Sequence, residues 1–421
     1  MKKIIRLSLA ATTALIGGLA AQAQYIWKPP VDPGARGPNS AGEPTKFEKV
    51  PTGEDKQIAD IVQLTSQLLN NRYGSNLARR GVHAKAHGCV LADFTVNSDI
   101  PESLRVGVFA KPGRTYKAWI RFSNATGLVT ADVEPARKPS GEVLLKPDGL
   151  PVLKATSRGM AIKLMGVEGD MLMNELGSKS QDFLLINQRM FAFPNVVEYL
   201  AVTQIQYANR DKGEDIAAYF APPLSPARAR TFGIAKEIAA TPLANPLDAA
   251  YFSAAPFLHG KDRVVKFSAK PRNPASPSDN PVKPADDYLR DALQASMTQK
   301  GEPIVFDFRI QTRPGGLQND DAAFPIEDAS AKWEDDKNAE KRAEFQDVAV
   351  VSIPRPQDVN DPLRVTECEH LVLTPWHGLV EHQPLGGINR LRRAVYIASS
   401  THRAQAAEPS APPKEYPLKK P

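Results

Sequence analysis

The chain has 421 residues, and its 53 Lys and Arg against 47 Asp and Glu give a formal net charge of +6. The basic residues are interleaved with acidic ones and form no Lys/Arg-rich stripe, so no nucleic-acid partner is indicated. After the N-terminus no stretch approaches the roughly 18 apolar residues of a membrane span. We therefore expect no stable membrane insertion.

The N-terminus has the pattern of a secretory signal peptide. Three basic residues within the first six precede an apolar run, and Ala21-Gln22-Ala23 follows as a small-x-small cleavage site. We expect residues 1–23 to be removed and the mature protein to be periplasmic or secreted. Residues 24–48 are rich in Pro, Gly and polar residues and predict an extended N-terminal arm.

The first predicted helix begins near Thr52, where Thr52 and Asp55 resemble a capping box, and runs to about Tyr73 with apolar residues at helical spacing. Strand-like runs separated by Pro and Gly clusters follow at 89–96, 104–110, 116–123, 160–165 and 183–187. So many β segments separated by turns favour a sheet closed into a barrel.

The later part of the chain is more helical. Helices are predicted at 194–208, 227–239, 285–299 and 388–404, and strands at 305–311 and 348–353. Residues 405–421 form a Pro- and Lys-rich tail that we expect to be disordered. The predicted fold class is α+β, with an antiparallel β-barrel and flanking helices spanning residues 49–404.

Two cysteines, Cys89 and Cys368, lie far apart in the sequence. Export would permit a disulfide, but a large core does not need one. Our expectation is two buried free thiols, with pairing as the alternative. The absence of C-x-x-C-H excludes covalent haem attachment of the cytochrome c type, and no C-x-x-C indicates a zinc or redox site.

Four separated segments carry the chemistry-bearing residues. They are Arg80-Gly-Val-His83-Ala-Lys-Ala, Ile120-Arg121-Phe122-Ser123, Ser157-Arg158-Gly159-Met160-Ala161-Ile162-Lys163 and Arg392-x-x-x-Tyr396-x-x-x-x-x-x-Arg403. In order and content they are similar to motifs of the catalase superfamily. Pro375-Trp376-His377 and the run from Glu381 to Gly386 resemble its small, catalase-like peroxidase branch. The resemblance implies haem b held between the barrel and the last helix.

On this resemblance Tyr396 is the axial ligand of the haem iron, as a phenolate that favours the ferric state. A tyrosine is normally neutral near pH 7, so a phenolate ligand needs nearby cations. Arg392, one helical turn earlier, and Arg403, two turns later, lie on the same helix face and could supply that charge. The alternative is a core tyrosine on an amphipathic helix.

His83 is implied to lie on the distal side of the haem, where a neutral imidazole can accept a proton from peroxide and return it. Ser123 matches the serine that hydrogen-bonds and orients this histidine. Arg80 and Arg121 match arginines that hold the haem propionates, with surface ion pairing as the alternative. Phe193, followed by Pro194, resembles the aromatic residue that stacks on the distal haem face, although the spacing is one residue longer than in the family.

One departure concerns an asparagine that, in the large catalases, cooperates with the distal histidine. Aligning the apolar run of this strand puts Lys179 and Ser180 opposite the two asparagines of that motif, and Gln181 is the nearest amide. Losing this amide should weaken the placement of a second peroxide. Peroxidase activity is then favoured over efficient dismutation.

The sequence therefore predicts a haem-dependent peroxidase that reduces hydrogen peroxide, or an organic hydroperoxide, with a small organic reductant and weak catalase activity. The alternatives are a haem-binding protein without efficient peroxide chemistry and an enzyme that rearranges fatty-acid hydroperoxides. The spacing of His370, His377 and His382 fits no helical metal-ligand pair, so we expect no additional metal. The short N-terminal arm favours a monomer or homodimer.

Overall fold

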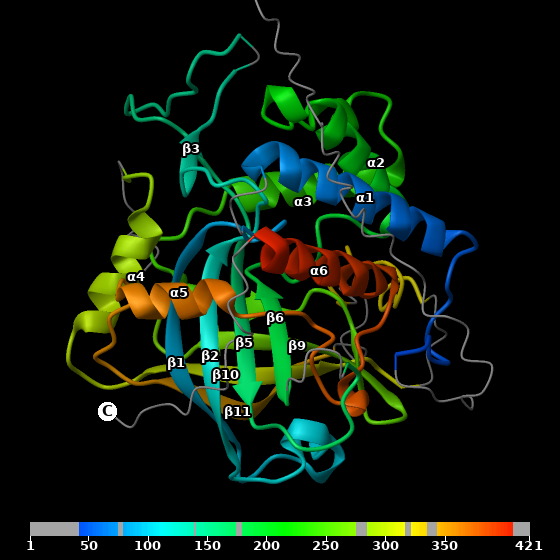
Figure 1. The fold of residues 1–421 in the computed structure, drawn as a ribbon, viewed down its shortest axis with the longest axis vertical. Helices are drawn as coiled ribbons and strands as arrows, with labels where there is room; N and C mark the ends of the chain where they lie inside the picture. The colour runs from blue at the N-terminus through cyan, green and yellow to red at the C-terminus, as the bar shows by residue number, and fades with distance from the viewer. Residues whose placement is uncertain are drawn as a thin grey trace, which may run out of the picture.

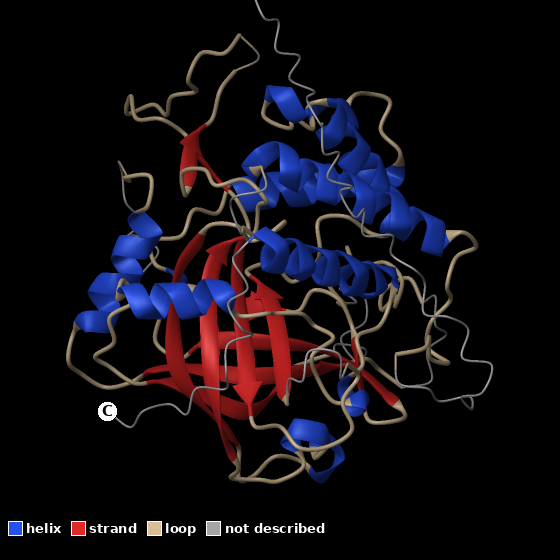
Figure 2. Ribbon diagram, viewed as in Figure 1, coloured by secondary structure: helices blue, strands red, loops and turns tan. Residues whose placement is uncertain are grey.

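The computed structural model describes residues 42–74, 79–138, 140–173, 179–274, 284–315, 321–334 and 343–406. Its centre is a sheet in the order β10-β11-β1-β2-β5-β6-β7-β9, which closes through a further pairing of β10 with β9 (Figures 1 and 2). The expected antiparallel barrel with flanking helices is confirmed.

The barrel strands are β1 (Ala86–Val96), β2 (Thr115–Asn124), β5 (Arg158–Met165), β6 (Ser180–Ile186), β7 (Tyr251–Phe252), β9 (Arg263–Pro271), β10 (Ile304–Thr312) and β11 (Phe345–Ile353). Strand β8 (Phe257–His259) extends the sheet beside β9, and β3 (Val133–Pro135) pairs with β4 (Leu153–Ala155) in a separate hairpin.

Alternation along the strands separates a packed interior from an outer face. On β1, Val90, Ala92 and Phe94 belong to the main core, whereas Cys89 and Leu91 pack in a second cluster. Successive side chains of a strand point to opposite faces, which accounts for this division. Aromatic rings fill the barrel interior, among them Phe183 and Phe308, whose ring centroids are 4.7 Å apart. It is a filled core rather than a channel.

The described chain contains six α-helices around the barrel: α1 (Glu54–Tyr73), α2 (Val196–Ala208), α3 (Pro226–Ala239), α4 (Tyr288–Thr298), α5 (Pro362–His370) and α6 (Gly387–Ala406). Helices α1, α2 and α3 gather above one end of the barrel, and α6 lies between them and strands β5 and β6 (Figure 1). Helix α5 crosses the outside of β1 and β2 (Figure 1). None of the helices in the described ranges is long and apolar enough to cross a membrane.

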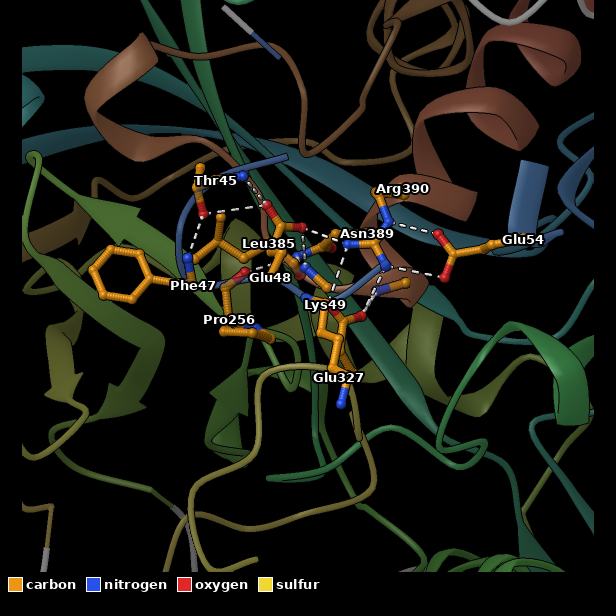
Figure 3. A network of polar contacts seen from close by, with 12 residues as sticks. Thr45, Phe47, Glu48, Lys49, Glu54, Pro256, Glu327, Leu385, Asn389 and Arg390 are labelled. Carbon is orange, nitrogen blue, oxygen red and sulfur yellow. Dashed lines mark hydrogen bonds and ion pairs between the residues drawn. The ribbon is translucent and has the colours of Figure 1, made fainter. Parts of the chain in front are cut away.

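The first turn of α6 is anchored by a network of charged groups (Figure 3). Arg390 donates to Glu54 of α1 at 2.5 Å, to Glu48 at 2.5 Å and to Glu327 at 2.8 Å. These carboxylates raise the pKa of Arg390 above its usual range, although burial opposes them. The backbone N–H of Gly387 also donates to Glu327. The network joins the N-terminal segment, α1 and a late loop to the start of α6.

Several boundaries differ from the sequence predictions. The predicted strand 104–110 is wrong: it forms two 3₁₀ turns, Glu102–Leu104 and Gly107–Phe109, because Gly107 adopts a left-handed φ of 54°. Helix α1 begins at Glu54 after Gly53, with no side-chain cap, so the Thr52–Asp55 capping box does not form. Strands β7 to β9 and helix α5 were not predicted. The predicted signal peptide, the predicted arm up to residue 41 and the predicted tail from residue 407 lie outside the described residues.

The expectation of two free thiols is also wrong. Cys89 of β1 and Cys368 of α5 form a disulfide, and their Cα atoms are 5.8 Å apart. Cys89 points away from the barrel interior, so its Sγ meets the helix that lies across the strand. The sequence separation of 279 residues concealed a contact that the fold creates.

Candidate functional site

A cavity lies between the outer face of the barrel and α6. Its empty space, counted together with the open solvent at its mouth, is about 1280 Å³. Most lining side chains are apolar: Val82, Ala125, Met160, Ala161, Leu184, Leu185, Ile186, Phe191, Ala192, Phe193, Ile238, Leu373, Ile388, Leu391 and Val395. The polar lining includes His83, Ser123, Arg80, Arg121, Arg392 and Tyr396. Seven of the eight predicted site residues, Phe193 among them, therefore line one cavity, and Arg403 lies outside its lining.

The barrel wall of the cavity follows from strand register. Arg121 is paired with Ala161, and Ala161 with Leu184, across β2, β5 and β6. Two positions further on, Ser123 is paired with Gly159. These residues occupy the outward positions of strands whose inward positions form the core. The same alternation thus builds the core on one side and the cavity wall on the other.

His83 precedes β1 and is held in an unusual backbone conformation. Its φ of 56° lies in the left-handed region, which non-glycine residues seldom adopt. Nδ1 of its ring is 2.9 Å from Oγ of Ser123. The neighbouring backbone is fixed by Gly81 N–H donating to Ser399 Oγ and by Ala84 N–H donating to the carbonyl of Thr126. A strained residue whose surroundings fix it in this way is typical of a functional site.

Gly159 gives the His83 ring its space. A Cβ atom at residue 159 would lie 2.4 Å from His83 Nδ1 and 2.9 Å from Ser123 Oγ. Any larger residue would therefore push the imidazole away from its position. This explains why glycine follows Arg158 in the third motif.

Burial is the main reason why the pKa of His83 falls from 6.5 to about 3, and the charges of Arg121, Arg392 and Arg80 add to the effect. The imidazole is therefore neutral near pH 7. A neutral ring can accept a proton at one nitrogen while the other is held by Ser123. The arrangement suits a proton acceptor that works on a ligand inside the cavity.

Helix α6 supplies the opposite group of residues. Ile388, Leu391, Arg392, Val395 and Tyr396 line the cavity, and this i, i+3, i+4, i+7, i+8 spacing is one face of an α-helix. The guanidinium of Arg392 lies over the Tyr396 ring, 5.5 Å from its centroid, and donates to Asn389 Oδ1 at 3.1 Å. The structure thus brings Arg392 to Tyr396, whereas Arg403 contacts the carbonyl of Glu369 at 2.8 Å.

Three arginines meet at the C-terminal end of α5. Arg121 donates to the Glu369 carboxylate at 3.3 Å, Arg80 donates to the Leu371 carbonyl at 2.7 Å, and Arg403 binds the Glu369 carbonyl. All three are buried, yet the Nε atom of each has no hydrogen-bond partner. Buried donors without hydrogen-bond partners are costly, and here they mark arginines whose donor capacity is not met among the described residues.

These features fit haem. The apolar walls suit a porphyrin ring, the arginines with unpartnered Nε atoms suit its propionates, and Tyr396 would hold the iron through its phenolic oxygen. Phe193 is an aromatic wall residue that contacts Tyr199 with ring centroids 5.5 Å apart. Across the described ranges, no group of three or more His, Cys, Asp or Glu side chains could hold a separate metal ion.

Sequence reasoning missed Tyr199 and Glu369. Tyr199 on α2 lines the cavity, and burial raises its pKa to about 12, so its phenol stays neutral. No family motif marks it, although its place on the inner face of α2 three positions after Val196 could have suggested burial. Glu369 became visible only when the fold brought α5 to the arginines.

The residues near the position of the family asparagine do not line the cavity. Ser180 accepts from Lys163 at 2.7 Å outside the cavity, and Gln181 Oε1 accepts from the Leu379 N–H at 3.0 Å. Among the described residues the cavity lining includes no Asn or Gln side chain. His377 contacts Asp182 at 3.1 Å, and His87 contacts Asn124 at 3.0 Å, so both have structural partners.

No protein-family model matches the sequence, and no curated protein matches it. Solved structures do match: a fungal catalase at 15% identity and TM-score 0.55, covering 78% of this chain and 59% of its own. Catalase A from Saccharomyces cerevisiae is 17% identical with TM-score 0.56, covering 81% and 63%. A bacterial catalase is 14% identical with TM-score 0.52, covering 98% and 71%.

The chain spans about three fifths of the length of the fungal and yeast catalases. At these identities the likeness shows the fold alone. The chain has a catalase-like fold.

Proposed function

We propose that this chain is a haem b peroxidase that reduces hydrogen peroxide, or an organic hydroperoxide, with a small organic reductant. One observation carries the proposal: a single cavity is bordered by the Ser123-held imidazole of His83, by Tyr396 under Arg392, and by buried arginines with unpartnered Nε atoms. When bound, haem supplies the iron at which the O–O bond of peroxide is cleaved. Export to the periplasm or the medium is part of the proposal.

Each residue of the site has a separate role in the proposed reaction. Arg80 and Arg121 would bind the haem propionates and orient the ring, and Tyr396 would hold the iron. His83 Nε2 is the atom at which the chain would accept a proton from peroxide and return it to the oxygen that leaves as water. Ser123 holds Nδ1, which fixes the direction in which Nε2 points. The apolar walls exclude bulk water from this proton transfer.

The balance between peroxidase and catalase activity follows from the lining. Dismutation needs a second peroxide to be positioned as reductant, and the described lining offers no amide for this purpose. Tyr199 is a neutral phenol in the same cavity and could donate to an organic substrate. We propose that organic donors outcompete peroxide as the reductant.

The test begins with the absorption spectrum of the haem-loaded protein. Tyr396→Phe should lose the bands of ferric iron bound by a phenolate, and unchanged bands would refute the ligand assignment. His83→Gln should keep those bands while donor-dependent peroxide reduction falls by about 10²–10⁴-fold, the usual range for a general acid–base residue. Rapid dismutation without an added donor would refute the peroxidase balance.

The second candidate is a haem-binding protein without efficient peroxide chemistry, which the absence of an amide from the described lining favours. In that case Tyr396→Phe would still change the spectrum, whereas His83→Gln would leave the reaction with peroxide unchanged. The pair of variants therefore separates a peroxidase from a binder.

A further inference from the structure

Glu369 places a carboxylate among the arginines of the cavity. Its Oε1 accepts from Arg121 Nη2 at 3.3 Å, and its Oε2 lies 3.9 Å from Arg80 Nε. The Glu369 side chain is 36% exposed, whereas the side chains of Arg80 and Arg121 are at most 8% exposed. The arginines hold the pKa of Glu369 below its usual range, although burial acts in the opposite direction.

The end of α5 adds further negative potential. Arg80 Nη2 donates to the carbonyls of Cys368, Glu369 and Leu371 at 3.3, 3.2 and 2.7 Å, and Arg403 also binds the Glu369 carbonyl. The last carbonyls of a helix carry the negative end of its dipole. One carboxylate and these dipoles still leave most of the charge of three arginines without a counterion among the described residues. The Nε atom of each arginine has no hydrogen-bond partner among the described residues.

The disulfide fixes this arrangement. Cys368 is the neighbour of Glu369 in α5, and Cys89 is paired in register with Arg121 across β1 and β2. The covalent link between Cys89 and Cys368 therefore holds the Glu369 carboxylate and the Arg121 guanidinium within reach of each other. Glu369 cannot leave the site unless its side chain turns outward.

We propose that Glu369 is a specificity-determining residue of the haem site, an internal carboxylate that competes with a haem propionate for Arg80 and Arg121. This inference rests on the proposed haem function and assigns to it a residue outside the motifs of the chain. Without haem, Glu369 keeps two buried arginines paired. When a propionate arrives, the Glu369 carboxylate repels it and must turn toward solvent, so haem is held less tightly than Arg80 and Arg121 alone would hold it.

The charge can be removed without changing the shape of the side chain. Glu369→Gln should tighten haemin binding about tenfold, which is the low end of the effect of one charge within about 4–6 Å because Glu369 is partly exposed. The same substitution should lower the Tm of the haem-free protein, since Arg80 and Arg121 lose their carboxylate. Tighter binding together with a less stable apoprotein is a combination that a merely structural residue would not produce.

The experiment is a titration of the full-length apoprotein with haemin, followed by the Soret band, beside a titration with haemin dimethyl ester. The matched control is Glu367→Gln on the same helix, because Glu367 acts on Arg364 rather than on the arginine cluster. Glu367→Gln should leave the Kd for haemin unchanged. For the dimethyl ester, which carries no propionate charge, wild type and Glu369→Gln should bind equally.

The outcomes separate the two proposals. A wild-type protein that binds no haemin refutes the proposed function and this inference with it. Haemin binding by wild type with an equal or larger Kd for Glu369→Gln refutes the inference alone, and so does an equal gain for the ester. If Glu369→Gln fails to fold, Glu369→Asp keeps the charge but draws it back by one methylene, and its Kd for haemin should lie below that of wild type.

Discussion

Gly159→Ala is the most direct test of the geometry around His83. The added Cβ would lie 2.4 Å from His83 Nδ1 and 2.5 Å from its Cε1, whereas non-bonded carbon contacts are normally about 3.5–4.0 Å. The imidazole must therefore move by about 1 Å, because the alternative is to deform the paired strands β2 and β5. A displacement of this size at a reacting group costs about 10²-fold in rate.

The assay is kcat/KM for peroxide reduction by the haem-loaded protein, together with the Soret spectrum and the Tm. We expect kcat/KM to fall by about 10²-fold and the free energy of unfolding by about 1–3 kcal/mol, as for an overpacked site, while the haem stays bound. Gly233→Ala in α3 is the control. A Cβ at that position meets no atom within 4 Å, and alanine is a better helix former by about 1 kcal/mol.

A double-mutant cycle decides whether His83 is the group that moves. In the background of His83→Ala the ring is gone, so adding Gly159→Ala should change kcat/KM little. Two effects that multiply would refute the reasoning, because Gly159 would then act through some other atom. A Gly159→Ala protein within about twofold of wild type would refute it outright.

Three further changes test the framework. The double variant Cys89→Ser with Cys368→Ser should lower the free energy of unfolding by about 3–5 kcal/mol, since the disulfide closes a very long loop. Denaturant unfolding of the variant measures this loss, and an unchanged unfolding midpoint would contradict the prediction. Arg390→Gln should lower the free energy of unfolding by about 3 kcal/mol, because it leaves three glutamates without their shared cation. Denaturant unfolding measures this loss, and stability equal to that of wild type would count against the network. Burial lowers the pKa of His259 to about 4 and of His382 to about 3, so each histidine takes up a proton on unfolding below about pH 6.5. As the pH falls below that value, each should lower the free energy of unfolding by up to about 1.4 kcal/mol per pH unit. Urea unfolding at pH 7 and pH 5 measures this, and equal stabilities would refute it.

The sequence predicts the parts of this protein whose signals are local. The helix that carries Tyr396 was predicted at 388–404 and is found at Gly387–Ala406, because its apolar face and the preceding glycines are visible in the sequence. Strands with apolar residues at alternate positions, such as β1 and β2, were placed within a few residues. Motifs also mark His83, Ser123, Arg80, Arg121 and Arg392 as candidates, and the structure places all five around one cavity.

The failures are those in which distant segments decide the outcome. Leu104 to Ala110 looks like a strand, but Gly107 packs under His382, where a Cβ would lie 2.3 Å from Nε2. The contact requires a turn, which no local pattern reveals. The partner of Cys89 depends on helix α5, which was itself missed although Asp361-Pro362 is a helix-start signal and Asp361 accepts from the Arg364 N–H. Glu369 was hidden for the same reason.

The two halves of the site are held by different parts of the molecule, which makes their contributions separable. His83 depends on the register of β2 and β5, through Ser123 and the space above Gly159. Tyr396 depends on the position of α6, which Arg390 ties to carboxylates of three other segments and Trp376 fixes through a 2.7 Å bond to the Asn389 carbonyl. Loss of the contacts that Ser123 and Gly159 make with His83 should therefore reduce the reaction with peroxide while haem stays bound, and damage to the start of α6 should release haem first. A haem binder needs Tyr396 and the propionate-binding arginines but not the Ser123-held imidazole, so the constraint that the chain keeps around His83 favours the proposed peroxidase over the binder.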